Sequence, residues 1–278
     1  MRDEIARRLK GDFEKRLFGA LLDNLAAPDS PIRFNNFSYA FRELVRVVLA
    51  RLAPDSEIVQ CAWYTNELNH ENGVTRAQRI KYAIQGGLAD QYVDEVLRVE
   101  VRPAQSALSK LVKLLSAYTH ISEGTFNLED KAVKENVHHC LEDALALFER
   151  IEECRRSIQQ SLWERVAEST EWAALSETLI EIDELATHHS IDEVYVDKFE
   201  VVTIDCHYVH FQATGTVGCE LQWGSNSDRR NGDGAVMKQS FPFTCTLRSS
   251  VEQPDEVEAE WGAFCADTSS WWDGYSDD

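Results

Sequence analysis

The sequence predicts an α+β protein, in which an N-terminal all-α helical bundle is followed by a C-terminal antiparallel, β-sandwich-like domain. Apolar residues recur every three to four positions through the first two thirds of the chain, and near Ser190 their period changes to two. The composition, 44% hydrophobic and 27% charged in 278 residues, is typical of globular proteins and unlike that of disordered chains. We therefore expect a helical domain over residues 1–188, and an antiparallel β domain with an acidic aromatic tail over residues 189–278.

Several helices are expected in the first of these domains. Asn35 and Asn36 are each able to cap the second helix, and Thr75 is a predicted cap for a short basic helix that Gly86 and Gly87 close. The predicted helices are residues 5–25, a run after Asn36 that reaches 52, residues 76–84, about 89–97, a run after Pro103 that includes 108–115, and about 128–168.

Strict alternation of apolar and polar residues predicts the strands of the second domain. The clearest alternation covers residues 216–223 and 240–247, and residues 199–204 and 206–213 are further predicted strands. Pro242 indicates an edge strand, because a proline has no N–H to donate to a neighbouring strand.

The charge distribution limits how this protein can meet a nucleic acid. The net charge is −20, and residues 191–278 hold 17 acidic and 5 basic side chains. Bulk attraction to duplex DNA is thereby excluded, because each phosphate contact needs a local Lys or Arg. The bases concentrate in the helical part, and we predict that Arg76, Arg79 and Lys81 bind nucleic acid there. The alternative for these residues is a solvated helix face with interleaved charges.

One segment after an apolar helix has the residue types of a catalytic site. His120 is a candidate general acid or base near neutral pH, with Thr119 beside it and Lys113 two turns earlier. The alternative is a histidine that stabilises a corner between helices. The chain has no HExxH, Walker A, GxGxxG after a strand or GxSxG, and we expect no metal site; the cofactor is left unknown.

A second polar segment joins two predicted strands. Its Asn-Gly and Asp-Gly pairs are typical of tight turns, so a structural loop is one interpretation. The other is a loop that binds a ligand or partner through Asp228, Arg229, Arg230 and Asp233.

The spacing of the cysteines and the lack of long apolar runs indicate in which cellular compartment the protein is expected. Seven widely spaced cysteines, with no CxxC pair, suggest reduced and mostly buried thiols. No run approaches the length of a membrane helix, and the N-terminus lacks a signal-peptide pattern, so we expect a cytoplasmic protein without membrane contact.

The sequence resembles the family of predicted pPIWI-associating nucleases. The stretches that carry the resemblance are residues 34–44, 51–55, 61–64, 75–88, 118–120, 221–225 and 240–243. The resemblance implies a bacterial antiphage or conflict system, with proposed nuclease activity and with other defence proteins as partners.

The helical part also resembles the HEPN class of helical bundles, whose active RNases carry an arginine and, after four to six intervening residues, a histidine. No arginine stands at that distance here, but lysine does: Lys113 precedes His120, Lys131 precedes His138, and Lys134 precedes His139. A lysine ammonium is a point charge and cannot donate the two parallel hydrogen bonds of an arginine guanidinium, so lysine is not equivalent to the arginine of this motif.

Two functions follow from these observations. The first is a nuclease, or a nuclease-associated effector, that acts on nucleic acid through the helical domain. The alternative is a non-enzymatic sensor or adaptor that binds a partner defence protein through the β domain. The oligomeric state is left open, with a homo-oligomer among the alternatives.

Overall fold

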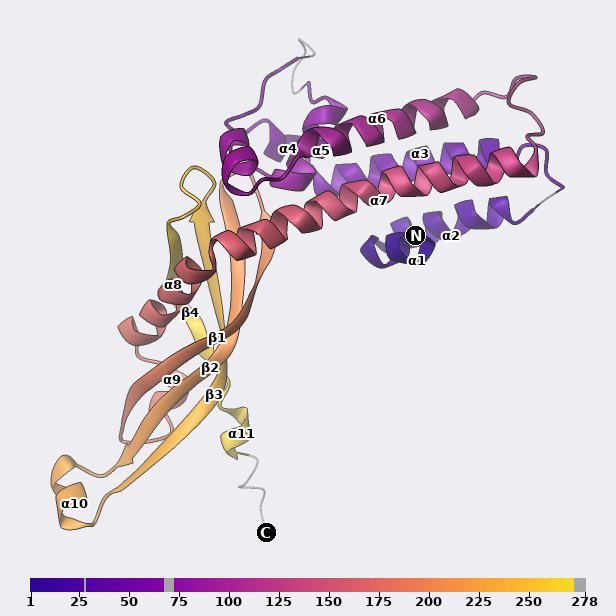
Figure 1. Cartoon of the computed structure of the whole chain (residues 1–278). Helices are drawn as coiled ribbons and strands as arrows, with labels where there is room; N and C mark the ends of the chain where they lie inside the picture. Colours follow the sequence, from indigo (N-terminus) through magenta and orange to yellow (C-terminus); the bar gives the residue numbers. More distant parts are fainter. Residues whose placement is uncertain (28, 68–72, 273–278) are drawn as a thin grey trace. The chain divides into compact units, whose positions relative to one another are not determined.

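The α+β class is confirmed by the computed structural model, which describes residues 1–278 apart from 28, 68–72 and 273–278 (Figure 1). The chain divides into two compact units, residues 1–157 and 158–278. The first unit is helical, and the second contains one four-stranded antiparallel sheet. Most of the predicted acidic tail lies outside the described residues. The domain limits 1–188 and 189–278 stay a prediction.

The first unit is built from helices that follow one another along the chain (Figure 1). They are α1 (Arg2–Arg8), α2 (Asp12–Leu25), α3 (Arg33–Leu52), α4 (Asp55–Ile58), α5 (Arg76–Gln85), the π-helix η1 (Tyr92–Val96), α6 (Val101–Tyr118) and α7 (Asp130–Ser161), whose last residues belong to the second unit.

The first predicted helix is in fact two helices, α1 and α2. Gly11 is the N-cap of α2 and has an extended conformation (φ −77°, ψ 139°). The Glu14 carboxylate accepts hydrogen bonds from the backbone N–H groups of Lys10 and Gly11. These bonds satisfy donors at the start of α2 and so end the preceding helix, which a count of apolar residues cannot detect.

Helix α3 begins earlier than predicted. It starts at Arg33, so Asn35 and Asn36 lie inside the helix and neither caps it. Asn35 is buried, and its Nδ2 donates to the carbonyl of Tyr118 at 2.9 Å. The Asn35 side chain therefore joins α3 to the end of α6.

Helix α3 is the centre of the first unit's core. Phe34, Phe37 and Phe41 are each no more than 1% exposed, and Phe34 meets the Tyr118 ring edge-on at 4.8 Å. The first turn of α3 thus lies beside the last residue of α6, and the two helices run in opposite directions. Four helices (α1, α3, α6 and α7) contribute the apolar side chains of one small region of this core: Ile5, Leu9, Phe41, Leu44, Val45, Val48, Leu108, Ala144, Leu147 and Phe148.

The second unit contains a sheet with the strand order β1-β2-β3-β4 (Figure 1). Its elements are α8 (Trp163–Ser176), α9 (Ile180–Asp183), β1 (His188–Ile204), β2 (Tyr208–Trp223), α10 (Asn226–Asn231), β3 (Ala235–Ser250), β4 (Val257–Ala266) and α11 (Ser269–Trp272).

One face of this sheet is buried and the other is not. In β3, Phe241, Phe243, Cys245 and Leu247 are buried, whereas the residues between them are exposed. Helix α8 packs against the sheet: the Ser169 hydroxyl donates to the Val257 carbonyl at 2.7 Å. The predicted sheet is therefore present, but the described residues form one sheet covered by a helix where the sequence suggested a sandwich-like pair of layers.

The prediction that Pro242 marks an edge strand is wrong for β3. It is an inner strand, between β2 and β4. Pairing with β4 begins at Phe243, directly after Pro242, whose carbonyl accepts from the N–H of Asp267, just beyond the end of β4, at 2.7 Å. The missing N–H therefore removes no bond from the β3–β4 ladder.

Two further features concern the whole described chain. All seven cysteines are free thiols, six of them buried and Cys265 exposed. Among the described helices, none combines the length and apolar content needed to cross a membrane.

Candidate nucleic-acid interface

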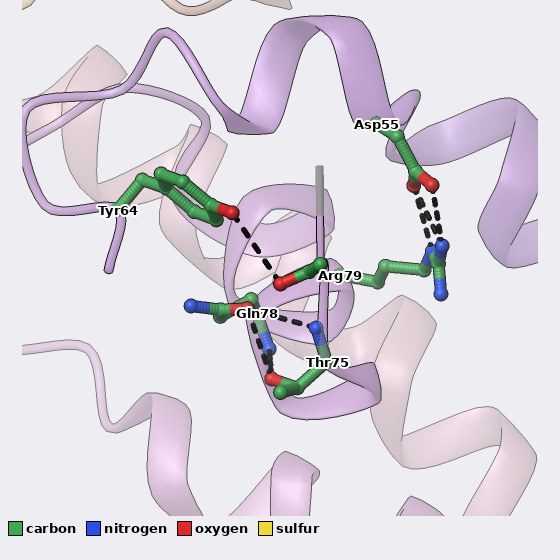
Figure 2. A network of polar contacts seen from close by, with 6 residues as sticks. Asp55, Tyr64, Thr75, Gln78 and Arg79 are labelled. Carbon is green, nitrogen blue, oxygen red and sulfur yellow. Dashed lines mark hydrogen bonds and ion pairs between the residues drawn. The ribbon is translucent and has the colours of Figure 1, made fainter. Parts of the chain in front are cut away.

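The short basic helix α5 is held in place by a dense set of polar contacts (Figure 2). Thr75 caps it as predicted: its hydroxyl accepts from the Gln78 N–H, and Gln78 Oε1 accepts from the Thr75 N–H at 2.8 Å. Gln78 Nε2 also donates to the Thr65 carbonyl at 2.6 Å. At the other end, Gly86 has a positive φ of 58° and ends the helix. The first turn of α5 is therefore fixed to the loop that precedes it.

Two of the three predicted binding residues on α5 have acidic partners. The Arg79 guanidinium donates to both carboxylate oxygens of Asp55, at 2.7 to 3.0 Å (Figure 2). The Lys81 ammonium lies 2.6 Å from an Asp90 oxygen and 4.2 Å from the centre of the Trp63 ring. Arg76 makes no hydrogen bond or ion pair within the described chain, so its guanidinium is available to a ligand.

Arg76 and Arg79 line a cavity of about 640 Å³ between α3, α5 and α6. Arg42 and Arg46, one turn apart on α3, line the same cavity. Apart from two carboxylates, the rest of the lining consists of small and apolar side chains and one hydroxyl: Val45, Leu49, Ala50, Ala53, Val112 and Ser116. The small alanines leave the space that the long arginine side chains border.

The cavity has an excess of positive charge. Its four arginines face two carboxylates, Glu43 and Asp55. Glu43 lies 2.8 Å from Arg46 and 3.9 Å from Arg42. These ion pairs are partly exposed, with side-chain exposures between 30% and 66%, and such pairs are weak in water. An incoming anion can therefore compete with the carboxylates for the guanidinium groups.

Four guanidinium groups around one cavity are suited to phosphate. Arginine donates two parallel hydrogen bonds to a phosphate and keeps its charge at any physiological pH. None of the described residues lining the cavity is aromatic, so base stacking contributes nothing from its walls. The arrangement can hold the phosphate backbone of a nucleic acid without selecting its sequence.

The structure brings together part of the predicted set and adds to it. Arg76 and Arg79 share the cavity, whereas Lys81 lines a different cavity beside Asp90, Asp94 and Glu100. Arg42 and Arg46 were not among the residues predicted to bind nucleic acid. Their spacing of four residues, which places both on one helix face, was the available signal.

The predicted catalytic residues lie at the end of α6 and beyond it. Lys113 and His120 are exposed, and the Thr119 hydroxyl donates to the Ser116 carbonyl at 2.7 Å. Within the described chain the His120 imidazole has no hydrogen-bond or ion-pair partner, so no carboxylate orients it. The catalytic role of these three residues stays a prediction.

The predicted loop in the second unit contains the short helix α10. Asp228 closes a capping box with Ser225, whose backbone N–H donates to Asp228 at 2.7 Å and lowers the pKa of that carboxyl group. Arg229 donates to Gln222 at 3.0 Å. Asp228 and Arg229 thus hold the loop together, and Arg229, Arg230 and Asp233 are exposed.

Histidine and carboxylate groups also meet elsewhere: His138 and His139 share Glu142 on α7, and another contact lies at the start of β2. His210 lies 2.7 Å from Asp205, which also accepts the backbone N–H groups of His207 and Tyr208. Burial alone would raise the pKa of Asp205, but these hydrogen bonds outweigh it and lower the pKa. Among the described residues, no three His, Cys, Asp or Glu side chains are grouped so as to hold a metal ion.

Comparison with known families accounts for nearly the whole chain. Two family models, both described as predicted pPIWI-associating nuclease, match residues 6–144 and 151–272. The first match contains the arginine-lined cavity, and the second contains the sheet. No curated protein and no solved structure matches the chain.

Proposed function

Because the chain belongs to the family of predicted pPIWI-associating nucleases, we propose that it is a nuclease or nuclease-associated effector of a prokaryotic antiphage system, and that it acts on nucleic acid through the arginine-lined cavity. The observation that carries this proposal is the gathering of Arg42, Arg46, Arg76 and Arg79 around one cavity in a chain of net charge −20. Other proteins of the same defence system are the proposed partners, and the cytoplasm is the proposed location.

The dimensions and lining of the cavity favour a flexible strand over a rigid duplex. A volume of about 640 Å³ is in the range of small-ligand pockets, so it accommodates a few phosphates and not the width of a double helix. The guanidinium groups that line the cavity come from two helices, α3 and α5. This arrangement suits a nucleic-acid backbone that can bend to reach both. We therefore expect single-stranded RNA or DNA to bind more tightly than duplex.

The binding part is tested with a double variant, Arg46→Gln with Arg76→Gln, in the full chain. Each substitution removes one positively charged guanidinium group from the cavity. We expect the affinity for a labelled single strand to fall at least about ten-fold, and the slope of log affinity against log salt to become shallower by about 1 to 2. Fluorescence anisotropy at several salt concentrations measures both.

The matched control is Arg7→Gln with Arg16→Gln. Both arginines are exposed on helices of the same unit, outside the cavity, and the pair changes the net charge equally. The control should bind like the wild type. If both double variants lose the same affinity for the single strand, binding depends on the overall charge and not on the cavity. If Arg46→Gln with Arg76→Gln leaves the affinity unchanged, the cavity is not the binding site.

Cleavage is tested separately, by incubating labelled RNA and DNA with the protein in the presence and absence of Mg²⁺ or Mn²⁺. If His120 is the proton carrier, His120→Ala abolishes cleavage while strand binding and Tm stay unchanged, because the side chain is exposed and without a partner in the described chain. Cleavage that survives in this variant excludes His120. A chain that binds no nucleic acid under any of these conditions would favour the adaptor function.

A further inference from the structure

A second cavity in the first unit has a different position and different residues. Its volume is about 330 Å³, and it lies where α3 and α7 begin. Three cationic side chains line it: Arg2, Arg33 and Lys134. None of its lining residues belongs to the arginine-lined cavity described above.

Arg33 is the most unusual of these cations. Its side chain is only 10% exposed, and it is the first residue of α3, where the helix dipole disfavours positive charge. Its guanidinium donates to the Asp130 carboxylate in the first turn of α7, and this hydrogen bond lowers the pKa of Asp130. The charge of a buried arginine must be compensated by a partner of opposite charge. One carboxylate oxygen accepts from only part of the five N–H donors of the guanidinium.

The remaining charges leave the cavity positive. Arg2 and Lys134 are exposed, and neither has an ion-pair partner within the described chain. His138, at the edge, lies 3.1 Å from Glu142. Among the described residues that line the cavity, the carboxylate of Asp130 is the one negative side chain, against three cationic side chains and the N-terminal ammonium of Met1, which pairs with Glu4 at 2.7 Å.

Part of the lining, on the same helix as Lys134, is apolar. Val133, Val137 and Leu141 are spaced by four residues, so they form one face of α7. A cationic group of side chains beside an apolar wall recognises a molecule with an anionic head and a flat, less polar body. The volume is near the lower limit for ligand pockets, which suits one nucleotide better than two.

We infer that this cavity binds a nucleoside monophosphate, whose phosphate contacts Arg2, Arg33 and Lys134 and whose base and sugar lie against Val133, Val137 and Leu141. This site is separate from the proposed strand-binding cavity and does not depend on it. It gives the helical unit a place for a free nucleotide in addition to a polymer.

Isothermal titration calorimetry of the full chain tests the site with AMP, GMP, CMP and UMP, and with inorganic phosphate and adenosine as partial ligands. At least one nucleoside monophosphate should bind more tightly than either partial ligand. Lys134→Gln should weaken that binding about five- to ten-fold, because one charge-assisted hydrogen bond is lost.

The matched control is Lys131→Gln, on the same helix, with a side chain that is 84% exposed and outside the cavity. It makes the same change of charge and should leave the affinity unchanged. Equal weakening by both substitutions, or no binding of any monophosphate at millimolar concentration, would overturn the inference. Phosphate that binds as tightly as the nucleotides would overturn the nucleotide assignment.

The strand-binding variant separates this inference from the proposed function. Arg46→Gln with Arg76→Gln should keep wild-type affinity for the monophosphate, because neither residue lines this cavity. If that variant loses the mononucleotide while Lys134→Gln keeps it, the ligand occupies the other cavity. The inference then fails, whereas the proposed function remains supported.

Discussion

A single buried carboxylate, Glu14, joins the start of α2 to the last turn of α3. Its side chain is 3% exposed, and its oxygens accept from Arg51 at 2.6 and 3.2 Å. Burial by itself would raise the pKa of Glu14, but the hydrogen bonds from Arg51 and from the backbone of Gly11 and Lys10 lower it below its ordinary value of 4.5. The ionised form therefore stabilises the fold above that pH, and the contribution is lost as the pH falls through the lowered pKa.

We expect Glu14→Gln to lower the free energy of unfolding by about 1–3 kcal/mol at pH 7, because Arg51 loses its charged acceptor. The difference from the wild type should shrink as the pH falls below 4.5. Urea unfolding from pH 7 to pH 3.5 measures this. Glu135→Gln, at a surface site that is 60% exposed, should stay within about 0.5 kcal/mol. A Glu14→Gln variant as stable as the wild type at pH 7 would contradict the assignment.

At the scale of elements, the residues just before and within α8 hold that helix against the sheet. Gln159 Nε2 donates to the Phe199 carbonyl at 2.7 Å, and the Trp163 and Phe199 rings lie 5.7 Å apart. Leu162, the N-cap of α8, is fully buried. These contacts join the start of α8 to β1, and residues 158–187 belong to the same compact unit as the β strands.

Leu162→Ala is expected to cost about 2–5 kcal/mol through the cavity it leaves, and to speed hydrogen exchange in the strand amides as well as in α8. Leu175→Ala, at a position of the same helix that is 58% exposed, should change neither. Faster exchange confined to α8 would mean that the sheet is stable without its helical layer, and would favour a domain limit near residue 188.

At the scale of the whole molecule, thiol accessibility reports on how completely both units are folded. Burial raises the pKa of Cys140, Cys154 and Cys245 to about 12 and that of Cys219 to about 11, so these thiols stay protonated at neutral pH. Cys61 and Cys206 are also buried, and Cys265 is exposed.

A thiol reagent at pH 8 should therefore label one cysteine per native chain quickly, and all seven after unfolding, since only the thiolate reacts. Cys265→Ser should remove the fast reaction. Mass spectrometry of digested, labelled protein identifies the site. Several fast thiols in the folded wild type would show that one of the cores opens readily.

Much of the fold could be predicted from local patterns. Thr75, Gln78 and Gly86 define α5 within one short stretch, so their capping signals could be recognised in the sequence. Alternation revealed the second halves of β2 and β3 for the same reason, although the predicted strands 206–213 and 216–223 are one strand, β2. The first half of β1 was missed because two of the three register shifts in its pairing with β2 lie between Ile191 and Lys198, and each shift breaks the period of two.

Local patterns along the chain were enough to predict the α+β class, the caps of α5, the alternation in β2 and β3, and the family, because each depends on residues close together along the chain. Which charges meet depends instead on how the helices pack. Arg79 pairs with Asp55 across 24 positions, and Arg42 shares a cavity with Arg76 because α3 and α5 pack together. The packing of the helices sets those distances, and the spacing of the residues along the chain does not. The arginine-lined cavity could therefore be recognised only from the three-dimensional arrangement of the helices.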